Sequence, residues 1–253
     1  MAPDAPLIPA VTAAQMREVD RLMVETYGVS LLQMMEVAGH ALAHLVRMHL
    51  GGAVAGKSLV VAAGHGNNGG GGQVAARHLS NWGAVVTVLI ESAERIPEVP
   101  HRQWETLAHL PVDRREGARA LEFFDRTRAD LIVDALIGYG LRGHPRGWTA
   151  AAITHINAQP APVIALDVPS GLDATTGQPA HPCINAAATI TLALPKTGLL
   201  TPSARPHVGA LYLADIGVPL ALLAHLHLDV GPIFGRRSLV RLDPQGRVIP
   251  DGR

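Results

Sequence analysis

The chain has 253 residues, 48% of them hydrophobic and only 4% aromatic, and its 21 basic and 21 acidic side chains cancel to a formal charge of zero. That length supports one large domain or two small ones with a substantial core. The neutral balance gives no electrostatic argument for binding nucleic acid or a membrane surface, and the few aromatic residues offer no stacking platform for single strands.

The cysteine content and the first residues bear on the compartment. The single cysteine, Cys183, excludes an internal disulfide and suits a reducing compartment, so we expect a cytoplasmic protein. The opening stretch "MAPDAPLIPAV" has neither the basic segment nor the apolar segment of a secretory signal. No apolar run reaches the length that crosses a bilayer, so no membrane association is expected.

Two helices are predicted at the start of the chain. Thr12 and Gln15 form a capping box ahead of apolar residues at helical spacing, which continue to about Tyr27. Ser30 and Gln33 repeat this signal ahead of "LLQMMEVAGHALAHLVRMHL". Both helices therefore precede the first predicted strand.

Apolar runs alternate with helical patterns along the rest of the chain. The predicted strands are "SLVVAA", "AVVTVLI", "ADLIVDALIG", "APVIALDVPSG", "AATITLAL" and "GALYLAD". The predicted helices are "GQVAARHLSNW", Arg102 to Ala108, Gly117 to Thr127 and "GWTAAAITHINAQ". This alternation is typical of an α/β fold with a parallel sheet covered on both faces. We expect one domain over residues 1–221 and a tail over residues 222–253 that either packs on a partner subunit or stays loose.

One motif is interpreted as a false match. The stretch "GGAVAGKS", Gly51 to Ser58, fits the phosphate-loop pattern G-x-x-x-x-G-K-[ST]. A true phosphate loop follows a strand and opens a helix, so that the first amides of the helix face the phosphates. Here a predicted helix precedes the motif and a predicted strand follows it. We therefore interpret its glycines as a turn and Lys57 as a solvated residue at the start of the strand.

The stretch "GHGNNGGGGQ", residues 64–73, follows the first strand and allows three interpretations. It fits the dinucleotide fingerprint G-x-G-x-x-G, with Glu91 placed at the end of the next strand to hold a ribose. It also fits a tight turn that needs positive φ. The third interpretation uses Asn67 and Asn68: backbone N–H groups at the helix start bind a pyrophosphate, while an amide oxygen binds a hard cation.

Acidic residues end two further strands. Asp134 and Asp167 each follow an apolar run and each precede a glycine-rich loop. One such residue is adequately explained as a helix cap or a turn residue. Two at the same edge of a parallel sheet favour a ligand site, because ligands of such sheets bind at the carboxyl ends of the strands. Asn68, Asp134 and Ser170 together would supply only oxygen ligands, which suits a hard cation and disfavours zinc.

A series of separated motifs resembles a known family. The stretches "VTAAQMREVDRLMVETYGVSLLQMMEVAGHALA", "GHGNNGGGGQVAARHL", "DALIGYGLRG", "ALDVPSGLDATTG", "PKTGLL" and "LADIGVP" occur in the order and spacing of the NAD(P)H-hydrate epimerases, the YjeF N-terminal domain family. The resemblance runs from about Val11 to Pro219. It implies a Rossmann-like three-layer αβα sandwich, a homodimer, and interconversion of the R and S epimers of hydrated NADH and NADPH. A dehydratase domain is expected to be absent, which makes a separate dehydratase the functional partner in cofactor repair.

The resemblance also assigns residues to roles. It implies one K⁺ per subunit, with Asn68, Asp134 and Ser170 as its ligands. It implies a substrate site that is formed by two loops and one acid, namely Asn67, Asn68, Gly69, Gly70 and Gly71, then Gly138, Tyr139, Gly140, Leu141, Arg142, Gly143 and His144, and Asp167.

The sequence departs from the family pattern at two positions. Gly71 replaces the family's Asp in the substrate loop, and Val37 replaces its Asn in the second helix. Both lost groups are polar and are expected near the site. A non-catalytic nucleotide-binding module of the same fold therefore stays open as an alternative, followed by an NAD(P)-dependent oxidoreductase based on the fingerprint.

Epimerisation at C6 of the reduced nicotinamide ring breaks and remakes a C–O bond. We expect the ring nitrogen to expel the hydroxyl, giving an iminium-like intermediate to which water returns on either face. One group must protonate the leaving oxygen, and the same or another group must deprotonate the water. Asp167 is the predicted catalytic residue, since it is the remaining carboxylate at a strand end that is not assigned to the ion.

Overall fold

Both predicted capping boxes start helices in the computed structural model, which describes residues 7–126 and 128–250. The Thr12 side chain accepts a hydrogen bond from the Gln15 amide and α1 follows over Ala13–Glu25. The Ser30 side chain accepts from the Gln33 amide and α2 follows over Leu31–His49. In each box the glutamine side chain also accepts from the N-cap amide, so two exposed donors at each helix start are satisfied.

The strands form one eight-stranded sheet in the order β3-β2-β1-β4-β5-β6-β7-β8. Pairing is parallel from β3 to β7, and only β8 is antiparallel to its neighbour. The strands are β1 Ser58–Ala63, β2 Val85–Ile90, β3 Val112–Glu116, β4 Leu131–Ala135, β5 Val163–Leu166, β6 Ala188–Leu192, β7 Ala210–Ala214 and β8 Leu239–Leu242.

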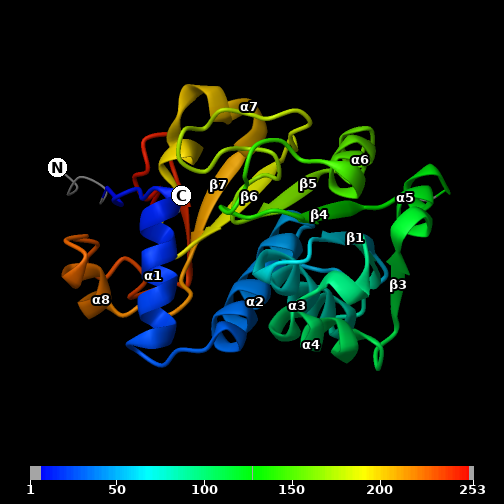
Figure 1. The fold of residues 1–253 in the computed structure, drawn as a ribbon, viewed down its shortest axis with the longest axis horizontal. Coiled ribbons are helices and arrows are strands. Elements are labelled where there is room, and N and C mark those ends of the chain that lie inside the picture. Colours follow the sequence, from blue (N-terminus) through cyan, green and yellow to red (C-terminus); the bar gives the residue numbers. More distant parts are fainter. Residues whose placement is uncertain (1–6, 127, 251–253) are drawn as a thin grey trace.

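Helices cover both faces of this sheet, as Figure 1 shows. Along β1, Leu59, Val61 and Ala63 face the core formed with α2, α3 (Asn67–Asn81) and α4 (Glu98–Leu107). Val60 and Ala62 face the opposite core, formed with α5 (Gly117–Arg126) and α6 (Gly147–Asn157). The predicted three-layer α/β fold is therefore confirmed. Thr127, the last residue predicted for the α5 helix, lies outside the described residues.

The remaining elements are short. They are the 3₁₀ helices Ala93–Arg95, Thr197–Leu200 and Pro202–Ala204, together with α7 Arg205–Val208 and α8 Leu220–His225. A third core joins α1 to β7 and to α8 through residues such as Val19, Leu213 and Leu222. The tail contributes β8, which pairs with β7 from Leu239 opposite Ala214 to Leu242 opposite Leu211. No helix within residues 7–126 and 128–250 is long and apolar enough to cross a membrane.

The glycine stretch corrects the sequence prediction. It was expected to be a loop followed by a helix from Gly72, but α3 begins at Asn67 and includes all four consecutive glycines. None of these glycines has positive φ, so the tight-turn interpretation is wrong. The physical reason is close packing. An added Cβ at Gly69 would lie 1.9 Å from the Gly64 carbonyl oxygen, and one at Gly72 would lie 2.5 Å from the Ala135 Cβ.

The false phosphate loop is a connection between α2 and β1, as predicted. Gly51, Gly52 and Gly56 all have positive φ there, which suits the turn that ends α2. The Lys57 side chain is 45% exposed and pairs with Asp130 at 3.4 Å. The motif therefore has neither the strand before it nor the helix after it that phosphate binding requires.

Candidate functional site

A cavity of about 540 Å³ opens where β1 and β4 lie side by side. From β1 the chain continues toward β2 and β3 on one side, and from β4 it continues toward β5 and β6 on the other. The loops that leave β1 and β4 diverge here, which is where ligands bind in this class of sheet. The cavity walls come from the β1–α3 and β4–α6 connections, the ends of β5 and β6, and the inner faces of α1 and α2.

The start of α3 points into this cavity. Gly66, Asn67 and Asn68 line it, and the N-cap Gly66 makes no side-chain capping bond. The first intrahelical bond is donated by the Gly70 amide to the Gly66 carbonyl, so the preceding amides have no partner within the helix. Free amides and the positive end of a 15-residue helix dipole form a seat for an anion such as a diphosphate.

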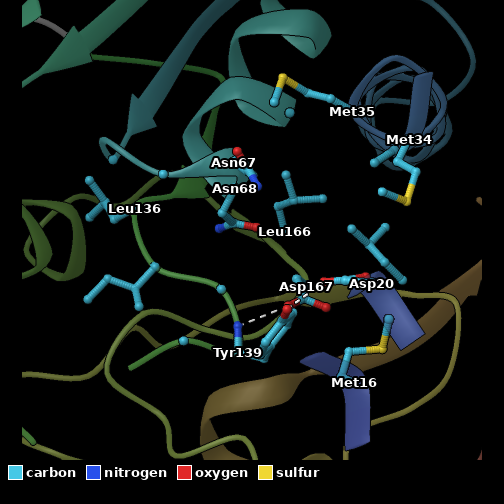
Figure 2. A pocket seen from close by; sticks show the side chains of 18 of the residues that line it. Met16, Asp20, Met34, Met35, Asn67, Asn68, Leu136, Tyr139, Leu166 and Asp167 are labelled. Atoms are coloured by element: carbon cyan, nitrogen blue, oxygen red, sulfur yellow. Dashed lines mark hydrogen bonds between the residues drawn. The ribbon is translucent and has the colours of Figure 1, made fainter. Parts of the chain in front are cut away.

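Asp167 stands at the end of β5 in an unusual backbone conformation. Its φ is 68°, in the left-handed region that residues other than glycine seldom adopt. Its Oδ2 accepts the Tyr139 backbone N–H at 3.0 Å, and its Oδ1 accepts Lys196 Nζ at 2.5 Å. Figure 2 shows Asp167 between the Tyr139 loop and the helix that carries Asp20. The carboxylate is therefore held by two donors from two different loops.

Lys196 is the principal residue that the sequence interpretation missed. It is fully buried after β6, and its ammonium also donates to the Leu192 carbonyl at 2.9 Å and the Thr191 hydroxyl at 3.2 Å. The ammonium lies 5.9 Å from the centre of the Tyr139 ring. Two signals could have found it: it is one of two lysines in the chain, and it follows a parallel strand on the same sheet edge as Asp167.

A second carboxyl group lines the same cavity. Asp20, on α1, accepts a short hydrogen bond from the Tyr139 hydroxyl through its Oδ2. Burial raises the pKa of Asp20, partly offset by the Tyr139 hydrogen bond and by the charge of Lys196. Burial also raises the pKa of Tyr139, with the negative charge of Asp20 adding to the effect. Asp20 was not predicted, because it lies on a helix far from any strand end in the sequence.

The expected cation ligands are partly brought together. Asp134 is fully buried; its Oδ1 accepts the Ser170 hydroxyl at 2.6 Å, and its Oδ2 accepts the Ser170 amide at 2.8 Å. Ser170 Oγ also accepts the Ile137 amide at 2.8 Å. One residue on, Gly138 lies against the Asn68 side chain, which a Cβ built on Gly138 would approach to 3.2 Å. Burial raises the pKa of Asp134 to about 6.

The donor set fits a hard cation on two observations. Asp134 accepts three hydrogen bonds but has no cationic side chain beside it among the described residues, so no positive charge balances its buried carboxylate. Asn68 Nδ2 is buried without a hydrogen-bond partner, so rotating this amide to present its oxygen would break no bond from the nitrogen. Asp134 also ties the Leu136 amide to Ser170, so part of its role is that of a turn-forming acid.

The other predicted substrate residues divide into two groups. Those that line the cavity are Asn67, Asn68, Gly71, Gly138, Tyr139, Gly140, Arg142 and Asp167. Those that are not part of its lining are Gly69, Gly70, Leu141, Gly143 and His144, and their roles stay predictions.

The two departures from the family pattern differ in position. Gly71 lines the cavity, so it stands where a lost carboxylate would matter. Val37 is 43% exposed on α2 and does not line the cavity, although its neighbour Ala38 does, so this position lies beside the site and not in it. A helical residue at that position points away from the sheet.

Comparison with known proteins gives consistent matches. The family described as "YjeF-related protein N-terminus" matches residues 31–198. An NAD(P)H-hydrate epimerase of Dehalogenimonas lykanthroporepellens is 41% identical over 85% of this chain and 84% of its own length. A bifunctional NAD(P)H-hydrate repair enzyme of Moorella thermoacetica is 38% identical over 90% of this chain, which covers 43% of that longer protein. The crystal structure of yeast ynu0 superposes with a TM-score of 0.80 at 27% identity, covering 93% of this chain and all of the yeast chain.

Proposed function

We propose that this chain, which belongs to the YjeF-related protein N-terminus family, interconverts the R and S epimers of hydrated NADH and NADPH. The observation that carries the proposal is the 41% identity to a bacterial NAD(P)H-hydrate epimerase over most of both chains. The cavity supports it independently, because it joins an anion seat, an apolar wall and a buried carboxylate, Asp167, that is held by two donors.

The cavity matches the two ends of a hydrated dinucleotide. Its apolar wall suits the nicotinamide ring and is formed by side chains such as Met16, Met34, Met35, Leu136 and Leu166. The α3 start, with Arg17 and Arg142 on the cavity rim, suits the diphosphate. A few polar groups on a mainly apolar surface are what a pocket for an orientation-specific ligand requires.

Asp167 is the proposed acid–base residue. Lys196 and the Tyr139 amide hold its carboxylate in one position and supply donors to both of its oxygens. Such fixed positioning suits a base that takes a proton from the water adding to C6. Lys196 would act as a positioning residue, because its ammonium donates all three of its hydrogen bonds to Asp167, Leu192 and Thr191.

A potassium ion is the proposed cofactor, with Asn68, Asp134 and Ser170 as the residues that would hold it. When bound, the cation would offset the buried Asp134 charge and fix the relative positions of the α3 start and the loop after β4. This assignment is supported by the oxygen-only donor set and by the uncompensated carboxylate.

Two further features of the family are proposed for this chain. The bifunctional relatives are named as repair enzymes, so a dehydratase that consumes one epimer is the proposed functional partner. A homodimer is also proposed. The alternative of a non-catalytic module is not favoured, because relatives that match most of this chain are named as epimerases.

The decisive experiment uses a mixture of the two epimers of hydrated NADPH and a dehydratase specific for one of them. The dehydratase alone should stop when its own epimer is consumed, and adding this protein should let the reaction run to completion. Asp167→Asn should lower kcat by about 10²–10⁴-fold, the usual contribution of one acid–base group, with little change in KM. Completion at the same rate with and without the wild-type protein would refute the proposed function.

A further inference from the structure

The reaction proposed above needs a proton donor that Asp167 does not provide. Its Oδ1 accepts from Lys196 and its Oδ2 accepts from the Tyr139 amide, so both oxygens act as acceptors. The hydroxyl that leaves C6 must nevertheless be protonated, because hydroxide is a poor leaving group at neutral pH. A second group in the cavity has to carry that proton.

Asp20 is the carboxyl group placed to do so. It lies on α1, lines the cavity, and shares Tyr139 with Asp167: the Tyr139 backbone N–H goes to Asp167 and its hydroxyl goes to Asp20. Figure 2 shows both carboxyl groups next to the Tyr139 ring. Only the Oδ2 of Asp20 takes part in a hydrogen bond within the described residues, so Oδ1 is not engaged by another protein group there.

We propose that Asp20 is a second catalytic carboxyl group of the epimerisation, the one that gives its proton to the departing C6 hydroxyl. This inference rests on the proposed function. Asp20 transfers its proton to the C6 oxygen, the C–O bond breaks with both electrons leaving on oxygen, and the ring nitrogen lone pair forms the C=N bond. Water then bonds to C6 from the face opposite the departed hydroxyl, the C=N electrons return to nitrogen, and the proton lost by the water goes to Asp167. That proton returns to Asp20 through water, so a full cycle leaves both groups unchanged.

The surroundings of Asp20 favour its protonated form, which its proposed role requires. Burial raises the pKa of Asp20, and the negative charge of Asp167 adds to the increase. The groups that act against it are the Tyr139 hydroxyl and the charge of Lys196. Arg17, on the same helix as Asp20, also lines the cavity, and its positive charge acts to lower the pKa of Tyr139. Asp20 accepts one hydroxyl donor, whereas Asp167 accepts an ammonium and a backbone amide, and two acids in different surroundings are a common arrangement for acid and base catalysis.

Asp20→Asn is the sharpest test, because an amide oxygen can still accept the Tyr139 hydroxyl while no proton can be donated. In the dehydratase-coupled assay, kcat should fall by about 10²–10⁴-fold with KM unchanged. Tyr139→Phe removes the hydroxyl but keeps both carboxyl groups, so its loss should be smaller. Glu18→Gln is the matched control, an acid-to-amide change on α1 at a side chain that is 42% exposed and paired with Arg21. It should behave as wild type.

The wild-type pH profile gives a second readout that does not depend on any variant. If Asp20 must be protonated, kcat falls as the pH rises through its pKa, and Asp20→Asn should lack that decline. A purely structural role predicts instead that Tyr139→Phe and Asp20→Asn lose activity equally and keep the same profile. That result, or an unchanged kcat for Asp20→Asn, would overturn the inference. An inactive wild-type protein would instead count against the proposed function itself.

Discussion

The glycines of α3 offer a test of how the site is built. An added Cβ at Gly69 would lie 1.9 Å from the carbonyl oxygen of Gly64 and 2.7 Å from its carbonyl carbon. These are backbone atoms of the loop that leaves β1, so relief requires the loop or the helix to move. At Gly71, by contrast, the added Cβ would meet one atom of the described residues, Leu166 Cδ2 at 2.9 Å, which is the end of a flexible side chain.

We expect Gly69→Ala to lower the free energy of unfolding by about 2 kcal/mol. Overpacking costs typically 1–3 kcal/mol, and displacing backbone puts this site at the upper end, about 3 kcal/mol. Alanine recovers about 1 kcal/mol through its better helix propensity. For a chain of this length, a net loss of about 2 kcal/mol lowers Tm by roughly 4–8 °C.

Thermal and urea unfolding of Gly69→Ala and Gly71→Ala, compared with wild type, measure this difference. Gly71→Ala should change the stability by less than about 1 kcal/mol, because propensity and a small shift of Leu166 offset each other. Equal stability of the two variants would refute the reasoning. It would mean that the loop after β1 adjusts freely and that close packing does not require the glycines.

Three further predictions concern the site. Lys196→Met should cost about 3–5 kcal/mol of stability by leaving Asp167 buried without its partner, and the double variant with Asp167→Asn should recover part of that loss in the same unfolding assay. If K⁺ binds at Asp134, saturating K⁺ should raise the free energy of unfolding by up to about 3 kcal/mol relative to a bulky organic cation at the same ionic strength. Thermal unfolding in the two salts measures this difference. Asp134→Asn should lose that difference, and an equal effect of both salts on wild type would argue against the ion. Gly71→Asp should raise kcat by well under the 10²-fold that one acid–base group supplies, and a larger gain would favour the alternative that this chain is a module whose catalysis was lost with that carboxylate.

The fold could be predicted wherever strands are uniformly apolar. β1, β2, β4 and β5 lie inside the sheet and are apolar apart from Ser58, Thr87 and Asp134, so their positions were found. β3 was missed because its sequence "VDRRE" is charged, which is tolerated at a sheet edge where the strand pairs only with β2. β8 was missed because four residues in a tail of mixed composition carry no clear pattern.

The site was predictable to the extent that it follows strand ends. Asn68 and Asp167 were found by that rule, and Lys196 would have been found had the rule been applied to the strand before it. Asp20 could not be found in this way. It reaches the cavity because α1 packs against the end of the sheet through Val19 and its neighbours, a contact between distant parts of the chain.

The backbone conformation at two neighbouring strand ends argues that the Asp167–Lys196 pair is there for chemistry. Asp167 after β5 and Ala193 after β6 both have positive φ, 68° and 63°, and each is the centre of a three-residue turn closed by a hydrogen bond to the strand's last carbonyl. Such conformations cost about 1–3 kcal/mol each in residues other than glycine. The first turn aims Asp167 at the cavity, and the second lets Lys196 reach back to both Leu192 and Asp167. A buried ion pair is itself weak evidence for stability. Strain and buried charge that coincide at one cavity are therefore better explained by the need to hold a carboxylate in place than by the needs of the fold.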